Sequence, residues 1–224
     1  MIRAGLIFCA VMTLAVGIIF AVWPDIDLAA ARYFYLGDKL FAGVTPAGEW
    51  ARRIGYVTPF LILTGAFGLW WMNARRGWPA RAPSGRTLLF LALSMALAPG
   101  LMANLLLKDH WHRPRPIQST EFGGPMEFRP WYRTDGACNR NCSFVSGEGS
   151  SAFWTLAPAL AAPAPVRPYA VVAAVAFGTA VSALRMAFGG HFLSDTLFAA
   201  LFTALIVLGL HRVMFSPPRC EPGA

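Results

Sequence analysis

Long apolar stretches alternate along the chain with shorter segments that hold nearly all of the charged residues. Six stretches are apolar enough to form membrane helices, and they cover roughly 4–23, 56–73, 87–107, 149–165, 169–188 and 193–213. Each is close to the ~20 residues that a helix needs to cross a bilayer. The fourth is shorter and contains Pro158 and Pro163, which membrane helices tolerate where neighbouring groups satisfy the freed backbone. The pattern predicts an all-α integral membrane protein with six transmembrane helices in one bundle.

The composition supports a single membrane-embedded domain over 1–224. Of the 224 residues, 56% are hydrophobic and 13% are charged, whereas soluble proteins carry about 25% charged residues. The first stretch could be mistaken for a signal peptide. Its apolar run is longer than the usual run of about 7–15 residues, and no clear cleavage site follows it. We therefore expect an uncleaved anchor.

The distribution of arginines predicts the orientation. The segment 73–86 has no acidic residue and carries Arg75, Arg76, Arg81 and Arg86. Short basic loops favour the cytoplasmic side, where they can also meet anionic lipid headgroups. Both termini should share that side, so the segments 24–55, 108–148 and 189–192 face outward. We expect a multi-pass protein of a bacterial inner membrane, with these outward segments in the periplasm.

The formal net charge of +8 does not indicate nucleic-acid binding, because the basic residues are divided between the two membrane faces. Cys138 and Cys142 lie in an outward segment, as "CNRNC". Their separation allows a disulfide in an oxidising compartment. Two free thiols are the alternative, and a metal site would need two further soft ligands that are not nearby.

Three polar clusters fall on the predicted outer side. The first, "KDHWHRPRP" at 108–116, offers Lys108, Arg113, Arg115 and a His110–His112 pair. Charges at a helix end can simply anchor it at the interface, and a zinc site at the histidine pair would lack a third ligand. The second cluster is Ser146-Gly147 before an apolar segment. A helix start can bind phosphate there, or Ser146 can act only as a helix cap.

The third cluster lies in "SALRMAFGGHFLSDTLF" at 182–198 and contains Arg185, His191 and Asp195. Four-residue spacing lets Asp195 accept a hydrogen bond from one ring nitrogen of His191, which leaves the other as a nucleophile. Lys108, Arg115 and Arg185 can surround a phosphate dianion. This combination predicts phosphoryl transfer through a phosphohistidine, and no metal or cofactor is expected because the cations neutralise the phosphate.

The spacing Lys108-x6-Arg115-Pro116, Ser146-Gly147 and Arg185-x5-His191-x3-Asp195 resembles the type 2 phosphatidic acid phosphatase superfamily. The resemblance covers about residues 100–200 and implies an integral membrane lipid phosphatase, with its site at the outer membrane surface in many bacterial members. It also implies that His191 is the nucleophile and that Asp195 orients it. Lys108, Arg115, Ser146, Gly147 and Arg185 would hold the phosphate.

Two positions depart from the family pattern. Leu184 precedes Arg185 where the family usually has serine, which is a minor change. Glu148 follows Gly147 where the family usually has the histidine that protonates the leaving oxygen. A carboxylic acid can replace it: burial and a bound phosphate favour its protonated form, and the neighbouring cations favour the carboxylate. We expect Glu148 to be the acid; His110 or His112 could take this role, or activity could be lost.

The predicted function is therefore hydrolysis of a phosphomonoester or diphosphate of a lipid at the periplasmic membrane surface. The substrate's apolar chains would lie among the helices, in contact with membrane lipids. Candidate substrates are phosphatidic acid, phosphatidylglycerol phosphate, undecaprenyl diphosphate and lipid A phosphates. The alternatives are a lipid-to-lipid phosphoryl transferase, a lipid-phosphate-binding membrane protein without turnover, and a vanadate-dependent haloperoxidase. The last is disfavoured because those haloperoxidases are soluble, whereas this chain is expected to be embedded in the membrane.

Overall fold

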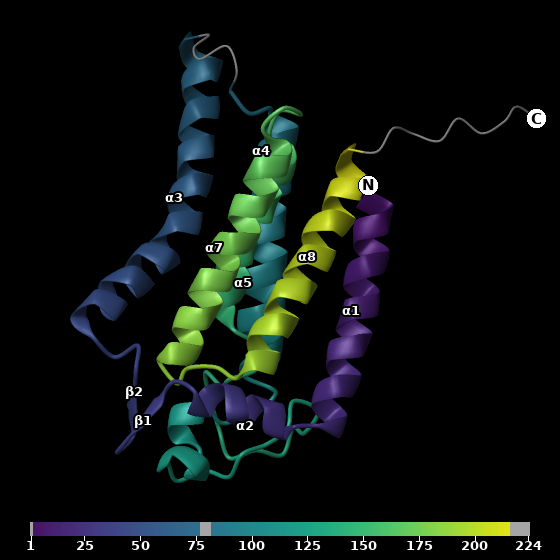
Figure 1. Ribbon diagram of the computed structural model, residues 1–224. Coiled ribbons are helices and arrows are strands. Elements are labelled where there is room, and N and C mark those ends of the chain that lie inside the picture. Colours follow the sequence, from purple (N-terminus) through teal and green to yellow (C-terminus); the bar gives the residue numbers. More distant parts are fainter. Residues whose placement is uncertain (1, 77–81, 216–224) are drawn as a thin grey trace, which may run out of the picture.

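The computed structural model describes residues 2–76 and 82–215, and these form a helical bundle with a small polar layer at one end (Figure 1). The bundle helices are α1 (Ile2–Val22), α3 (Pro46–Arg76), α4 (Gly85–Met95) with its continuation η1 (Ala96–Leu107), α5 (Gly147–Phe153), α6 (Leu156–Ala161), α7 (Arg167–Ala187) and α8 (Leu193–Phe215). The end layer contains α2 (Asp25–Arg32), strands β1 (Tyr35–Gly37) and β2 (Leu40–Phe41), and the short helices η2 (Pro116–Gln118) and η3 (Thr120–Phe122).

Five helices in the described part are long and apolar enough to cross a membrane. They cover Ile2–Val22, Pro46–Arg75, Gly85–Leu107, Arg167–Ala187 and Leu193–Phe215. The predicted stretch 149–165 instead forms the two short helices α5 and α6, with a turn at Trp154 and Thr155. Pro158 explains the break, because it has no N–H to donate and its ring crowds the carbonyl four residues earlier. The prediction of six single helices is therefore confirmed for five of them.

Prolines also shape two of the long helices. Pro59 lies inside α3, and Figure 1 shows the first part of this helix leaning away from the bundle. Pro99 lies inside η1, which has the wider turns of a π-helix. Its wider spacing extends to the next residue, because the Lys108 N–H donates to the Ala103 carbonyl 3.2 Å away. The end of η1, where Lys108 stands, is thus set by an irregular helix.

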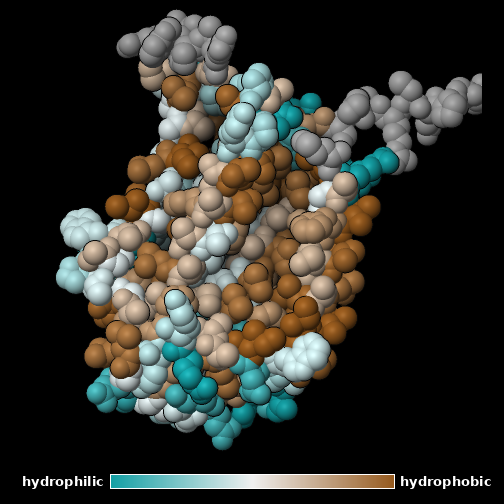
Figure 2. Space-filling view, viewed as in Figure 1, coloured by the Kyte–Doolittle hydropathy of each residue, from teal (hydrophilic) through white to brown (hydrophobic). Residues whose placement is uncertain are grey.

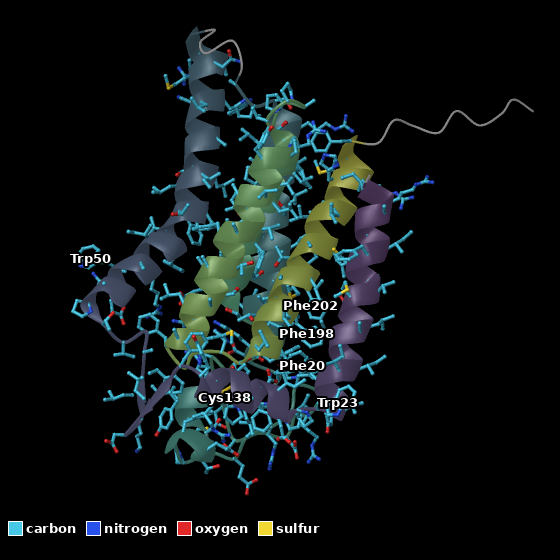
Figure 3. The ribbon with its side chains drawn as sticks, in the orientation of Figure 1. Phe20, Trp23, Trp50, Cys138, Phe198 and Phe202 are labelled. Carbon is cyan, nitrogen blue, oxygen red and sulfur yellow. A yellow bond between two sulfur atoms is a disulfide. The ribbon has the colours of Figure 1, made fainter. Side chains whose placement is uncertain are left out.

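Apolar side chains hold the bundle together and also cover its outside. α1 packs along α8, and Figure 3 places Phe20, Phe198 and Phe202 between these two helices. A second core surrounds Trp154, whose indole N–H donates to Ser94 Oγ at 2.9 Å. Figure 2 shows apolar residues around the helices and hydrophilic residues at the end where α2 and the strands lie. This surface matches a chain that meets lipid along its sides.

The two ends of the bundle differ in what they carry. α1 begins and α8 ends at one end, together with the described residues around Arg75 and Arg86 (Figure 1). The opposite end holds the polar layer, the segment 108–146 and the turn between α7 and α8. All three predicted polar clusters therefore meet at this opposite end. Arg81, which entered the orientation prediction, lies outside the described residues.

Candidate active site

A buried guanidinium joins three separate parts of the chain beneath the site. The Arg113 side chain is fully buried; its Nη2 lies 2.7 Å from Asp27 Oδ2 and its Nη1 lies 2.5 Å from Asp195 Oδ1. Nη1 also donates to Ser194 Oγ at 2.8 Å. Asp27 comes from α2 and Asp195 from the first turn of α8, so the pairings connect both helices to the segment after η1. Two carboxylates around one guanidinium satisfy a charge that would otherwise be costly to bury.

Asp195 organises the loop around it. Its Oδ2 accepts the Ser143 hydroxyl at 2.5 Å and the Phe192 N–H at 2.8 Å. Because Oδ1 is taken by Arg113, both carboxylate oxygens are occupied by groups other than the His191 ring. Asp195 thus holds Ser143 and the turn before α8 in one arrangement.

His191 receives its orientation through Ser143. The ring Nδ1 lies 2.7 Å from the Ser143 carbonyl oxygen and 3.9 Å from Asp195 Oδ2. A carbonyl can only accept, so Nδ1 carries the hydrogen and Nε2 keeps its lone pair. The expected direct bond to Asp195 is absent among the described residues, because His191 precedes α8, which begins at Leu193, and the four-residue helical spacing does not apply. Asp195 acts on His191 through Ser143 instead.

Three cations lie near the His191 ring. Burial lowers the pKa of His191 well below its usual 6.5, and the positive charges of Arg185, Lys108 and Arg115 lower it further. The ring is therefore neutral at physiological pH, as a nucleophile requires. Burial, and then the charges of Arg115 and Arg185, lower the pKa of Lys108 to about 8. Burial also lowers the pKa of Arg115. Such crowding of like charges indicates a site built for an anion.

Glycines make room for two of these cations. A Cβ on Gly147 would lie 3.1 Å from Lys108 Nζ and 2.5 Å from Asn104 Oδ1. A Cβ on Gly190 would lie 2.6 Å from Arg185 Nη2. A side chain on Gly190 would therefore displace the Arg185 guanidinium, and one on Gly147 would displace the Asn104 amide and crowd the Lys108 ammonium. Ser146 caps α5, because its Oγ accepts the Gly149 N–H at 3.1 Å, so the capping interpretation describes its position here.

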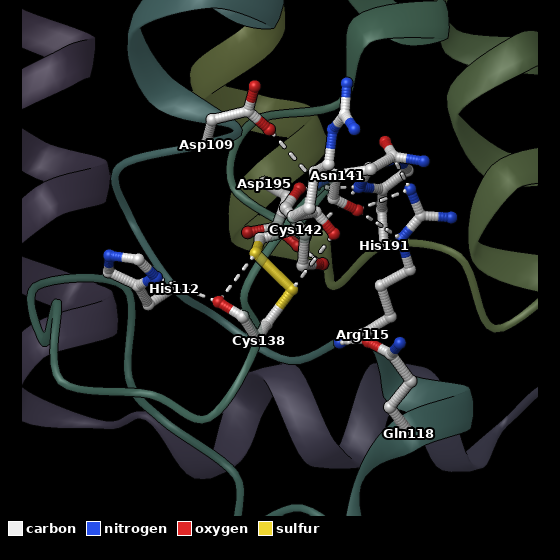
Figure 4. Close-up of a disulfide and its surroundings, with 11 residues drawn as sticks. Asp109, His112, Arg115, Gln118, Cys138, Asn141, Cys142, His191 and Asp195 are labelled. Atoms are coloured by element: carbon white, nitrogen blue, oxygen red, sulfur yellow. Dashed lines mark hydrogen bonds and ion pairs between the residues drawn. A yellow bond between two sulfur atoms is a disulfide. The ribbon is translucent and has the colours of Figure 1, made fainter.

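The segment 138–142 braces Arg115 (Figure 4). Cys138 and Cys142 form a disulfide, with their Cα atoms 5.7 Å apart. Between them, the Asn141 carbonyl accepts from Arg115 Nε at 3.1 Å and from Nη2 at 2.8 Å. The His112 Nδ1–H donates to the Cys138 carbonyl at 2.9 Å. His112 thus supports this loop, whereas the exposed His110, which follows η1, donates to the Leu106 carbonyl of that helix at 3.0 Å.

Glu148 has a partner that the sequence does not suggest. Arg52 of α3 donates to it through Nη2, 3.0 Å from Oε1, and through Nε, 3.3 Å from each carboxylate oxygen. Arg185 Nε lies 3.6 Å from the same Oε1. The Glu148 side chain is 17% exposed, so the carboxylate is partly shielded from water. Arg52 lies 96 residues before Glu148, in the segment 24–55 that was expected to face outward.

The structure therefore brings together Lys108, Arg185, His191, Asp195 and Glu148 at one end of the bundle. Arg115 is close enough for its charge to lower the pKa of the His191 ring. Sequence reasoning missed Asp27, Arg52 and Ser143, and gave Arg113 no role of its own. Asp27 and Arg52 are charges within the mixed polar and aromatic segment 24–55, where no spacing links them to their partners. The presence of several charged residues in that segment was the one sequence feature that could have pointed to them.

The fold and site define a class of membrane protein with a buried, neutral histidine among cations. The chain belongs to the PAP2 superfamily, whose family profile matches residues 87–218, more than half of its length. The helices and the relatives described next together indicate a bacterial membrane protein.

Three relatives are similar over most of the chain, and each is a lipid A 4'-phosphatase. The one from Francisella tularensis subsp. novicida is 28% identical over 222 residues, which cover 96% of this chain and 98% of the relative. The one from Rhizobium etli is 31% identical over 206 residues, covering 86% and 80%. The one from Rhizobium leguminosarum is 30% identical over 207 residues, covering 86% and 88%. No solved structure is significantly similar to the chain.

We predict that Arg113→Gln strongly destabilises the fold. The change leaves Asp27 and Asp195 buried without a cation, which costs about 3–5 kcal/mol of unfolding free energy. Thermal unfolding of the purified protein in detergent measures the loss. Arg133→Gln is the matched control, because Arg133 pairs with Asp135 on the exposed surface and should change little. Equal shifts for both variants would contradict the structural role of Arg113.

We also predict that affinity for inorganic phosphate falls about tenfold as pH rises through about 8. Lys108, whose pKa lies there, is an ammonium below this pH and binds the anion; above it the charge is lost. Binding is measured between pH 7.5 and 9 and expressed per phosphate dianion, which corrects for the titration of phosphate itself. Lys108→Arg keeps its charge throughout this range, so its affinity should stay level. The same decline in the Lys108→Arg protein would exclude Lys108 as its origin.

Proposed function

We propose that this chain is a lipid phosphatase that removes the 4'-phosphate of lipid A through a phosphohistidine intermediate at the periplasmic membrane surface. The relatives support the coarser statement, a phosphomonoester hydrolase that acts on a lipid phosphate. The observation that carries the mechanism is the contact of His191 Nδ1 with the Ser143 carbonyl. This contact leaves the lone pair of Nε2 available to attack the substrate, and Lys108, Arg115 and Arg185 lie near enough to bind its phosphate.

The first half of the reaction forms a bond from His191 Nε2 to phosphorus and breaks the bond from phosphorus to the sugar oxygen. Glu148, protonated, gives its proton to that oxygen, and the dephosphorylated lipid leaves as an alcohol. Lys108, Arg115 and Arg185, with Ser146 and Gly147 at the start of α5, stabilise the charge on the other phosphate oxygens. Positioning and charge supply most of the acceleration.

The second half returns the enzyme to its starting state. Water gives a proton to the Glu148 carboxylate and attacks phosphorus, the bond from phosphorus to Nε2 breaks, and inorganic phosphate leaves. His191 is again neutral and Glu148 again carries the proton that it had in the substrate-loaded site, so no group is consumed. The Nδ1–H bond to the Ser143 carbonyl stabilises the positive ring of the intermediate.

The membrane arrangement is part of the proposal. Arg75 and Arg86 stand at the end opposite the site, which the positive-inside rule assigns to the cytoplasm with both termini. The disulfide at the site end suits an oxidising periplasm. α5 and α6 together would then complete the sixth crossing, and 1–224 would act as one phosphatase domain.

Phosphate release by the detergent-purified protein tests this function. With EDTA present, we expect release from the 4' position of lipid A to exceed release from phosphatidic acid, phosphatidylglycerol phosphate and undecaprenyl diphosphate. His191→Ala should lower release at least about 10³-fold, because it removes the nucleophile. Acid-labile phosphate bound to the wild-type protein, and absent from the variant, would report the intermediate. A folded wild-type protein that releases no phosphate from any lipid would contradict the proposal.

The role of Glu148 predicts a dependence on the leaving group. Glu148→Gln cannot donate the proton, so hydrolysis of the lipid phosphate should fall about 10²- to 10⁴-fold. An aryl phosphate with a good leaving group, such as p-nitrophenyl phosphate, needs little protonation and should be hydrolysed at nearly the wild-type rate. Initial rates on both substrates measure the contrast. Equal losses on the two would assign Glu148 to binding rather than to proton donation.

A further inference from the structure

Glu148 lies against two arginines, although its proposed role as an acid needs it protonated. Its Oε1 lies between two guanidinium groups, 3.0 Å from Arg52 Nη2 and 3.6 Å from Arg185 Nε. Both arginines also flank one aromatic ring: their Cζ atoms lie 5.8 Å and 6.0 Å from the Phe188 centroid. Two arginines from different helices, α3 and α7, therefore converge on a single anionic oxygen.

Arg185 has a buried donor group that could bind a closer hydrogen-bond acceptor than Glu148. Its side chain is only 6% exposed, and within the described residues its Nε has no hydrogen-bond partner, since Glu148 stands beyond hydrogen-bond distance. A buried donor left in this state costs free energy that an incoming acceptor recovers. The nearby charges of Lys108 and Arg115 favour an acceptor that carries more than one negative charge.

Arg52 can follow such an acceptor although it also contacts Glu49, whose Oε2 lies 3.8 Å from Arg52 Nη1. Its side chain is 38% exposed, and it stands on the part of α3 that leans away from the bundle (Figure 1). A cavity of about 280 Å³ lies beside it, lined by Glu49, Arg52, Arg53, Tyr56 and Glu148. Glu148 therefore borders open space into which its carboxylate can turn when another anion takes its place.

We propose that Arg52 is a phosphate-binding residue, which Glu148 occupies in the empty site and releases when the substrate enters. A phosphate oxygen replaces Glu148 Oε1 between Arg52 and Arg185. The displaced carboxylate, now facing a dianion and without its arginine partners, takes up one proton from solvent. Loading of the site thus produces the acid that the leaving oxygen needs. The inference rests on the proposed function and adds a residue outside the family-matched range 87–218.

Binding of orthovanadate at constant pH tests Arg52 without requiring turnover. Arg52→Gln should weaken binding about 10- to 100-fold, because a charge-assisted bond is lost. Glu148→Gln should bind vanadate more tightly than wild type, since the competing carboxylate is gone. Arg53→Gln is the matched control: it removes the same charge one residue away, where the guanidinium lies over Trp50 at 5.4 Å. Thermal unfolding confirms that each variant is folded, and Arg52→Lys, which keeps the charge, should restore most of the affinity.

The double variant separates binding from mere neutralisation of Glu148. If Arg52 binds the anion, Arg52→Gln in a Glu148→Gln background should still lose about 10-fold or more in vanadate affinity. If Arg52 only pairs with Glu148, the double variant will bind as tightly as Glu148→Gln, and the inference is overturned. It is overturned equally if Arg52→Gln behaves like Arg53→Gln, or if the wild-type protein does not bind vanadate.

Proton uptake provides an independent readout. Calorimetric titration of vanadate in two buffers of different ionisation enthalpy should show about one more proton taken up by the wild-type protein than by Glu148→Gln. Equal uptake by the two proteins would overturn the coupling between loading and protonation. Phosphate release from lipid A by the wild type and Arg53→Gln reports the proposed function separately. Its absence, with Arg52-dependent vanadate binding intact, would contradict the hydrolase and leave the anion site standing.

Discussion

The buried ion pairs of Arg113 are the constraint on which the arrangement of the candidate active site depends. This guanidinium meets Asp27 and Asp195, and it lies over the rings of Phe192 and Phe128, with its Cζ 4.6 Å and 5.5 Å from their centroids. Burying a charge is favourable only when its partners are fixed. The position of Asp195 is therefore determined from both sides, by α2 and by the segment after η1. The groups that Asp195 binds are positioned in turn, among them Ser143, whose carbonyl accepts the hydrogen bond of His191.

The orientation of His191, the proposed nucleophile, depends on a backbone group in a segment without long helices or strands. Ordering such a segment costs about 1–2 kcal/mol per residue in backbone entropy. Several contacts oppose that cost around Ser143: its hydroxyl bond to Asp195, the adjoining disulfide, and the neighbouring Phe144 ring stacked on Trp111 at 4.6 Å. A carbonyl fixed in this way selects the His191 tautomer as firmly as a carboxylate would, without placing a second negative charge against the ring.

The sequence predicted the features that depend on neighbouring residues, and it missed the contacts between residues that are far apart along the chain. Five apolar stretches form long helices because each is one apolar run long enough to cross a membrane. The motif residues lie together at one end of the bundle because each motif adjoins a helix end. Trp154–Thr155 became a turn through the local effect of Pro158. The contacts of Asp27 with Ser194 and of Arg52 with Glu148 span 167 and 96 residues. No local rule connects such partners, so only the folded chain reveals them.

Pairing of Glu148 with Arg52 explains how a carboxylate can stand in an anion site without spoiling it. Lys108, Arg115 and Arg185 bring three positive charges near His191. The histidine that the family resemblance leads one to expect would leave that charge unchanged when neutral, whereas an unpaired Glu148 would reduce it and repel a phosphate. Arg52 adds one positive charge against the one negative charge of Glu148. The net positive charge that favours a dianion is thus kept, and the Glu148 carboxylate is paired.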